Sequence, residues 1–295
     1  MTSPLTFVTG KGGAGKTTVA AALGLSYAAA GQRTLVCELD GLARVPRALG
    51  VEPGGLETRL RPRLWSISIG AEGALNEWLT GKIGRAAALL RRSSAFGYFV
   101  AAAPGAAELV ELGKAIDLAR GGRYDRVIVD GPATGHAVAM LATPGTFARV
   151  AGHVPIGEEA AGLERFLRES TAYVGVTLPE PMAIAELLEL EAALPETIGR
   201  GLDEIVVDSV HPVRFTDAEA EQVAAVAGSG LEPVLVEHRR AVRQREQVER
   251  LRAAARAPVR TLPFVFAYAT GGELLERLVA ELATAPRDQP SLTTA

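Results

Sequence analysis

Short apolar runs alternate with longer segments of helical period along the chain. Residues 5–9 (LTFVT) form the first run, and a glycine-rich loop and the alanine-rich stretch 17–30 follow it. Gly31 then precedes a second apolar run, 34–40 (TLVCELD). This order predicts strand, loop, helix and strand, which is the βαβ unit from which parallel sheets are built.

Five later apolar runs predict further strands. Segments of helical period separate them, and this alternation is typical of a doubly wound, mainly parallel α/β sheet. The runs are LWSISI (64–69), RVIVD (126–130), EIVVDSV (204–210), PVLVE (233–237) and RTLPF (260–264).

Two segments are too long to be simple crossovers between strands. We expect helical insertions at about 71–121 and 145–200, within a single domain that covers 1–285. Residues 286–295 (PRDQPSLTTA) are predicted to be disordered. The apolar positions of the insertions recur with helical spacing, which favours a helical layer over the sheet; a groove for an apolar partner is the alternative. One such face holds Leu109, Leu112, Ile116 and Ala119.

Charge and composition narrow the class of protein. The 295 residues carry a net charge of −3, so we expect no nucleic-acid partner. No stretch approaches the roughly 20 apolar residues of a membrane span, and no signal peptide is evident, so we expect a cytoplasmic protein without direct membrane insertion. The arginine-rich residues 238–260 also contain glutamates, which favours a solvated helix over a lipid- or nucleic-acid-binding one.

The first loop matches a phosphate-binding motif. Residues 10–17 (GKGGAGKT) fit G-x-x-x-x-G-K-[ST] between a strand and a helix. Lys16 is predicted to reach the β- and γ-phosphates, Thr17 to ligate Mg²⁺, and Thr18 to bond the α-phosphate. The expected cofactors are therefore ATP and Mg²⁺. Backbone N–H groups of the loop would surround the phosphates, at Gly10, Gly12, Gly13, Ala14 and Gly15.

A second lysine, Lys11, lies in the same loop. Of the 31 basic residues only four are lysine, and two of these four are Lys11 and Lys16. The variant K-G-G-x-G-K-[ST] resembles the deviant Walker A motif of the P-loop NTPase family that contains the ArsA arsenical-pump ATPase, the tail-anchored-protein targeting ATPase, MinD and ParA. The resemblance implies a dimer with nucleotide at its interface, in which Lys11 acts as a catalytic cation on the partner's nucleotide.

Two carboxylates follow predicted strands. Asp40 resembles the family's first switch aspartate, which orients the attacking water, although this chain has Asp-Gly-Leu-Ala where the ArsA branch has Asp-Pro-Ala-His. Asp130 ends an apolar run and resembles the Walker B aspartate, which holds Mg²⁺. The segment 130–136 (DGPATGH) is similar to the second switch of the ArsA branch, with Gly135 placed to sense a γ-phosphate through its N–H. Residues 103–115 also resemble a helical segment of that branch.

The base-binding residues depart from the branch. A strand that ends in asparagine reads adenine there, whereas this chain has Asp208 in the corresponding place. A carboxylate accepts a hydrogen bond from adenine N6 or from guanine, so the base preference stays open. Pro263 and Phe264 resemble the segment that packs on the base.

The resemblance implies an ATPase of the ArsA branch that couples its nucleotide state to conformational change and partner binding. Its partners would be a second copy or a paralogue, together with an unknown protein client or membrane protein. The chain has one cysteine, Cys37, which cannot form a disulfide or a multi-cysteine metalloid site, so arsenite transport is not expected. The alternatives are a positioning ATPase of the MinD or ParA kind and a nucleotide-binding subunit with little hydrolysis.

Overall fold

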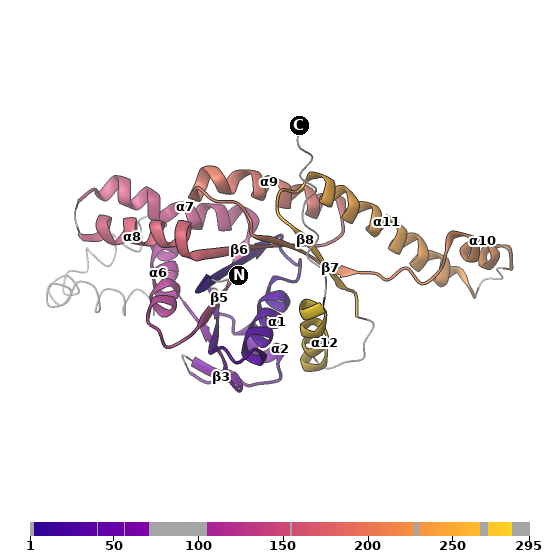
Figure 1. Cartoon of the computed structure of the whole chain (residues 1–295), viewed down its shortest axis with the longest axis horizontal. Helices are drawn as coiled ribbons and strands as arrows, with labels where there is room; N and C mark the ends of the chain where they lie inside the picture. The colour runs from indigo at the N-terminus through magenta and orange to yellow at the C-terminus, as the bar shows by residue number, and fades with distance from the viewer. Residues whose placement is uncertain are drawn as a thin grey trace.

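The computed structural model describes residues 3–39, 41–55, 57–70, 105–153, 155–226, 230–265 and 271–284. Within these residues one sheet of eight strands has the order β3-β4-β2-β5-β1-β6-β7-β8 (Figure 1). Only the pair β3 and β4 is antiparallel; the other neighbouring pairs are parallel. The strands are β1 (Leu5–Gly10), β2 (Thr34–Glu38), β3 (Glu57–Arg61), β4 (Leu64–Ser68), β5 (Arg126–Ala133), β6 (Thr171–Thr177), β7 (Glu204–Val210) and β8 (Val259–Pro263).

Helices cover both faces of this sheet, which confirms the predicted doubly wound α/β fold. In Figure 1, α1, α2 and α12 lie on one side of the strands, and α7, α8 and α9 lie on the other. The pair α10 and α11 extends away from the body of the molecule. The described helices are α1 (Lys16–Ala29), α2 (Arg44–Ala48), α6 (Ala106–Arg120), α7 (Thr134–Ala151), α8 (Pro155–Ser170), α9 (Pro181–Ile198), α10 (Asp217–Val226), α11 (Glu232–Ala254) and α12 (Gly271–Thr284).

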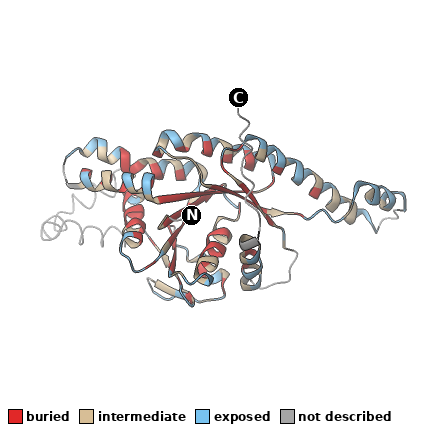
Figure 2. Ribbon diagram, viewed as in Figure 1, coloured by how far each residue is buried: buried red, intermediate tan, exposed pale blue. Residues whose placement is uncertain are grey.

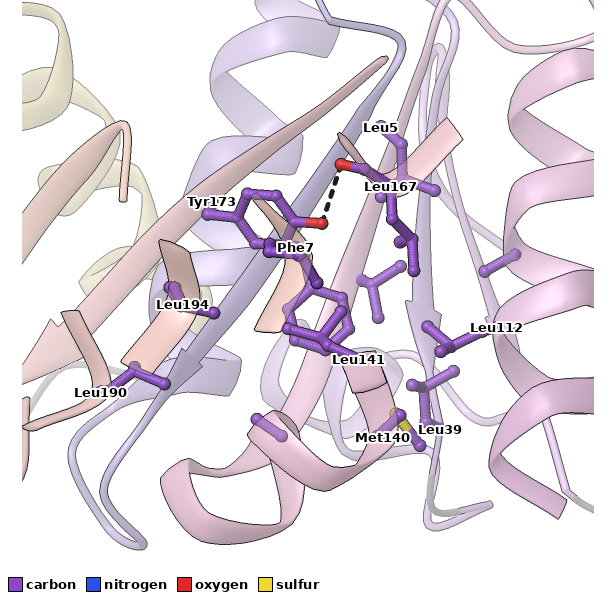
Figure 3. Packing of buried hydrophobic residues seen from close by; sticks show 14 of the residues in the cluster. Leu5, Phe7, Leu39, Leu112, Met140, Leu141, Leu167, Tyr173, Leu190 and Leu194 are labelled. Carbon is purple, nitrogen blue, oxygen red and sulfur yellow. Dashed lines mark hydrogen bonds between the residues drawn. The ribbon is translucent and has the colours of Figure 1, made fainter. Parts of the chain in front are cut away.

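Two hydrophobic cores form because successive strand residues point to opposite faces. Leu5 and Phe7 of β1 lie in the core under α6 to α9, whereas Val8 lies in the core under α1 and α12. The central strands are buried along most of their length (Figure 2). In the first core the Tyr173 hydroxyl donates a hydrogen bond to the carbonyl of Leu167 at 2.9 Å, beside the ring of Phe7 (Figure 3).

The segment 145–200 is not purely helical. It contains β6, which pairs with β1 on one side and β7 on the other, at the centre of the sheet. The apolar run carries Gly175, which weakens a strand signal. Leu187 and Leu202 pack closely over Gly175, because an added Cβ would lie 2.8 Å from their side chains. The helices expected around this strand are present as α8 and α9.

The prediction of a strand at PVLVE (233–237) is wrong, because these residues form the first turns of α11. Pro233 suits the first turn of a helix, where its missing N–H leaves no intrahelical bond unmade. Val236 is 50% exposed, so its β-branched side chain has no sheet to pack in. The arginine-rich helix that was expected from 238 belongs to the same element and ends at Ala254.

Several sequence-based expectations lie outside the described residues. They are the catalytic role of Asp40, the part of the first helical insertion before residue 105, and the disordered tail at 286–295. The last part of that insertion is α6, where Leu109, Leu112 and Ile116 are buried as expected.

Candidate nucleotide-binding site

The phosphate loop connects the carboxyl end of β1 to the N-terminus of α1. Gly15 is the N-cap of α1 with φ 88°, and no side chain caps the helix. Gly10 is equally constrained, since a Cβ there would lie 1.9 Å from the carbonyl oxygen of Val176. The first turn of α1 therefore presents backbone N–H groups that no side chain of its own satisfies, which is an arrangement that binds anions.

Lys16 begins α1, and its side chain turns back over the loop. Its Nζ donates a hydrogen bond to the carbonyl oxygen of Lys11 at 3.1 Å. Partial burial lowers the pKa of Lys16, while the charge of Asp130 opposes this change and the charge of Arg44 adds to it. The Lys16 ammonium group thus lies beside the loop, where a bound phosphate would be its partner.

Thr17 and Asp130 lie in direct contact although 113 residues separate them. The Thr17 hydroxyl donates a hydrogen bond to Oδ2 of Asp130 at 2.6 Å. The pairing of β1 with β5 sets Val8 opposite Asp130, which brings the end of β5 beside the loop. A hydroxyl and a carboxylate side by side fit Mg²⁺, which prefers oxygen ligands.

A cleft of about 400 Å³ opens beside these residues. It contains two cationic side chains and two carboxylates over an apolar floor, where Figure 3 shows Met140 beside Leu39. The lining residues are Gly12, Gly13, Lys16, Leu39, Arg44, Glu111, Asp130, Gly131, Pro132, Ala133, His136 and Met140.

Arg44 and Glu111 in this cleft were not expected from the sequence. Glu38 places Arg44, because its buried carboxylate accepts the N–H groups of Arg44 and Val45 at 2.5 and 3.2 Å and so holds the start of α2. Glu111 is 9% exposed on a helix face that is otherwise apolar. A carboxylate among buried positions is the sequence signal that could have identified it.

The second-switch segment forms the end of β5 and the start of α7. Gly135 is the second residue of α7, whose N-cap, Ala133, provides no side-chain cap. Pro132 and His136 line the cleft, and the Thr9 hydroxyl donates to the carbonyl oxygen of Pro132 at 2.9 Å. The structure thus brings the Gly135 region to the phosphate loop, although Gly135 itself does not line the cleft.

Lys11 does not point into the cleft. Its Nζ lies 2.7 Å from Oε1 of Glu186 on α9, and the two side chains are 33% and 36% exposed. In a single chain the two lysines therefore have different partners, Lys16 within the loop and Lys11 on the helical layer.

The residues expected to bind the base lie at the carboxyl ends of β7 and β8. Asp208 is 8% exposed, and burial raises its pKa to about 6. Phe264 donates its backbone N–H to the carbonyl of Val210 at 2.8 Å, and its ring stacks on His211 at 4.3 Å. Burial lowers the pKa of His211. Pro263, the last residue of β8, precedes this aromatic pair.

These groups are spread along one edge of the sheet. Asp130 lies in the carboxyl half of β5 and Asp208 in that of β7, and the strands between them are β1 and β6. With about 4.8 Å between neighbouring strands, the two ends are roughly 14 Å apart. The arrangement suits an extended nucleotide with its phosphates over β1 and β5 and its base near β7 and β8.

Asp40 is not among the described residues, so its role as the residue that orients water stays a prediction. Its neighbour Leu39 lines the cleft, and Gly41 follows with φ 71°.

Two further absences apply to the described residues alone. They contain no cluster of three or more His, Cys, Asp or Glu side chains suited to a metal ion. None of their helices combines the length and the apolar character that crossing a membrane requires.

Comparison with known proteins finds relatives that match more than half of this chain. The chain is 31% identical to the ATPase BagA of Mycobacterium tuberculosis over 200 residues, which are 63% of this chain and 59% of BagA. It is 28% identical to an arsenical pump-driving ATPase of Escherichia coli over 207 residues, which are 60% of this chain and 32% of that protein. The chain thus spans well under two thirds of the length of either relative.

The sequence model of the anion-transporting ATPases matches residues 4–159. This range includes the phosphate loop, both switch segments and Asp130, and it covers more than half of the chain. The chain therefore belongs to the ArsA-type family of anion-transporting ATPases.

Proposed function

We propose that this protein binds ATP with Mg²⁺ and hydrolyses it as a dimer, with a second copy or a paralogue as the partner. The observation that supports this most strongly is the convergence of the uncapped α1 N-terminus, Lys16 and the Thr17–Asp130 pair on one cleft. Similarity to proteins that are named as ATPases also supports it.

Different groups in and beside the cleft bind the phosphates, hold the metal ion and orient the attacking water during phosphoryl transfer. Backbone N–H groups of the loop and the Lys16 ammonium hold the phosphates and place the γ-phosphate toward Asp130. Mg²⁺, held by Thr17 and Asp130, supplies positive charge to the phosphate oxygens when it is bound. Asp40 orients the water that attacks the γ-phosphate, and the loop groups stabilise the developing negative charge.

Lys11 contributes from one subunit to the nucleotide of the other. In the single chain it is paired with Glu186, and the two side chains are 33% and 36% exposed. Water partly screens such an ion pair, so the pair can open when a partner's phosphate is offered.

The client of this cycle is an unidentified protein or membrane protein. Loss of the γ-phosphate would release the switch segments. The second of these segments includes the start of α7, which packs with α8 and α9 in the helical layer, so its movement would change that layer. Cys37 is fully buried and its thiol pKa is raised by burial, so it offers no metalloid ligand. Arsenite is therefore not proposed as the cargo.

A direct test measures binding and turnover of ATP by the whole chain. Lys16→Ala is expected to reduce turnover at least 100-fold, because it removes the charge that faces the phosphates. Arg245→Ala, an exposed cation on α11, serves as the control and should behave as wild type. Equal turnover in all three proteins would refute the proposal.

The second candidate is a nucleotide-binding subunit with little hydrolysis, which is favoured by the absence of the branch's histidine after Asp40. Turnover of wild type and Asp40→Asn decides between them. Equally slow turnover in both proteins while ATP still binds would favour the binding subunit.

A further inference from the structure

We propose that Asp208 recognises the adenine base as a neutral carboxylic acid, so that ATP binding takes up one proton at this side chain. The inference rests on the proposed function, because it concerns the same nucleotide site. It assigns Asp208 as the residue that determines base specificity.

The position of Asp208 places its carboxyl group beside the nucleotide path. Oδ2 lies only 2.2 Å from the point that a Cβ on Gly15 would occupy, so the carboxyl group rests directly on the N-cap of α1. The stacked pair of His211 and Phe264 follows the ends of β7 and β8. Phe264 is 37% exposed, which leaves part of its ring open to a base.

The surroundings of Asp208 do not favour a negative charge. The side chain is buried, and among the residues that the structure describes its charged form is supported by the neighbouring Ser209, whose N–H donates to Oδ1 at 2.8 Å. This bond holds Oδ1 as an acceptor, which leaves Oδ2 to carry a proton. Desolvation is the main cause of the raised pKa, about 6 before any ligand is present.

Within the described parts of the chain, no opposite charge contributes to the pKa of Asp208. Charged and titratable groups on the neighbouring elements include Lys16 on α1 and His211 after β7, together with three residues around that histidine. None of these groups contributes to the pKa shift of Asp208. The three residues are Arg214, Glu237 and Arg240. A bound nucleotide brings phosphates and displaces water, and both changes raise the pKa further.

The chemistry of purines connects the proton to specificity. Adenine presents a donor, N6, next to an acceptor, N7 or N1, on either of its hydrogen-bonding edges. A carboxylate only accepts, whereas a carboxylic acid accepts through one oxygen and donates through the other, as an asparagine amide does. Guanine has two adjacent acceptors, O6 and N7, on one edge and two donors, N1 and N2, on the other, which an ionised carboxylate would match better.

The first experiment uses the wild-type chain and titration calorimetry at pH 7.5 in two buffers with different heats of ionisation. The probes are the non-hydrolysable triphosphate analogues of ATP and GTP with Mg²⁺, whose phosphates are alike. We expect the adenine nucleotide to take up close to one proton more than the guanine nucleotide. Equal proton uptake, or tighter binding of the guanine nucleotide, would overturn the inference.

The second experiment compares wild type with Asp208→Asn between pH 6.5 and 8.5. The wild-type Kd for the ATP analogue is expected to rise by nearly 100-fold over this range, because a Kd linked to the uptake of one proton changes about tenfold per pH unit. The variant supplies donor and acceptor without a proton, so its Kd should change less than twofold. Asp217→Asn, an exposed carboxylate on α10, should follow wild type.

The outcomes separate the two proposals. Parallel pH profiles for wild type and Asp208→Asn refute proton-coupled recognition while nucleotide binding stands. Absence of nucleotide binding in both proteins at every pH refutes the proposed function itself, and the role of Asp208 with it.

Discussion

At the scale of single residues, the site includes ionisable side chains whose burial lowers the stability of the folded protein. Asp208 is the clearest case, because burial raises its pKa in the folded protein to about 6, above the usual 3.8 of an aspartate. The folded protein therefore binds this proton more tightly than the unfolded chain does. Its contribution to stability falls as the pH rises from about 4 through 6 and stays low above that range.

Asp208→Asn is accordingly expected to stabilise the folded protein at pH 7.5. One pKa unit corresponds to about 1.4 kcal/mol, so the gain is at most about 3 kcal/mol. At pH 4 the aspartate is protonated in the folded state and the gain should be small. Urea denaturation of both proteins at the two pH values measures this; an equal difference at both would contradict the assigned burial.

The residues of the phosphate loop could be predicted because backbone chemistry restricts them. Gly15 has a positive φ and no space for a Cβ, and Lys16 and Thr17 follow it directly, so a short motif carries the whole arrangement. Arg44 and Glu111 could not be found in this way. Arg44 reaches the cleft because buried Glu38 holds the start of α2, and Glu111 reaches it through the packing of α6. Both depend on tertiary contacts that a local motif does not contain.

At the scale of elements, apolar pattern alone did not separate strand from helix in short runs. The TAYVGVT run became the central strand β6, and PVLVE became the start of α11. The difference lies in what surrounds them: Tyr173 is fully buried between two strands, whereas Val236 is half exposed. Neighbouring elements that are distant in sequence decide such cases.

The contact between α9 and the phosphate loop carries the next prediction. Glu186→Gln removes the charge that holds Lys11 on α9, so Lys11 becomes available to a partner's nucleotide. Because water partly screens the pair, we expect turnover at low protein concentration to rise by no more than about fivefold. Lys11→Ala should lose most turnover and keep nucleotide binding.

Glu189→Gln on the same helix is the control, because Glu189 is exposed and has no assigned role. Steady-state ATP hydrolysis over a range of protein concentrations is the measurement. If Glu186→Gln lost as much turnover as Lys11→Ala, the prediction would be contradicted. Glu186 would then hold Lys11 in its active position, and would not keep it away from the partner's nucleotide.

At the scale of the whole molecule, the features of the site converge on one surface at the carboxyl edge of the sheet. Gly12 and Gly13 of the loop are exposed there. Met182 is 70% exposed and lies one helical turn before Glu186 on α9, so the two share a face. An exposed methionine beside the loop is suited to a contact between subunits.

Dimerisation driven by ATP should therefore depend on this surface. In an Asp40→Asn background, which slows hydrolysis if Asp40 orients the attacking water, ATP with Mg²⁺ is expected to double the mass measured by light scattering. Adding Met182→Asp should weaken the dimer at least tenfold, since it places a charge in the contact, while nucleotide binding to the single chain stays unchanged.

Val150→Asp is the matched control. Val150 is 84% exposed near the far end of α7, about 15 Å along the helix beyond Met140, which lines the cleft. It offers an apolar side chain of similar exposure outside the proposed interface, so its loss should leave the dimer intact. If Val150→Asp broke the dimer and Met182→Asp did not, the subunits would meet at the C-terminal end of α7 and not at the face of α9 beside Glu186, and Lys11 would not reach the partner's nucleotide.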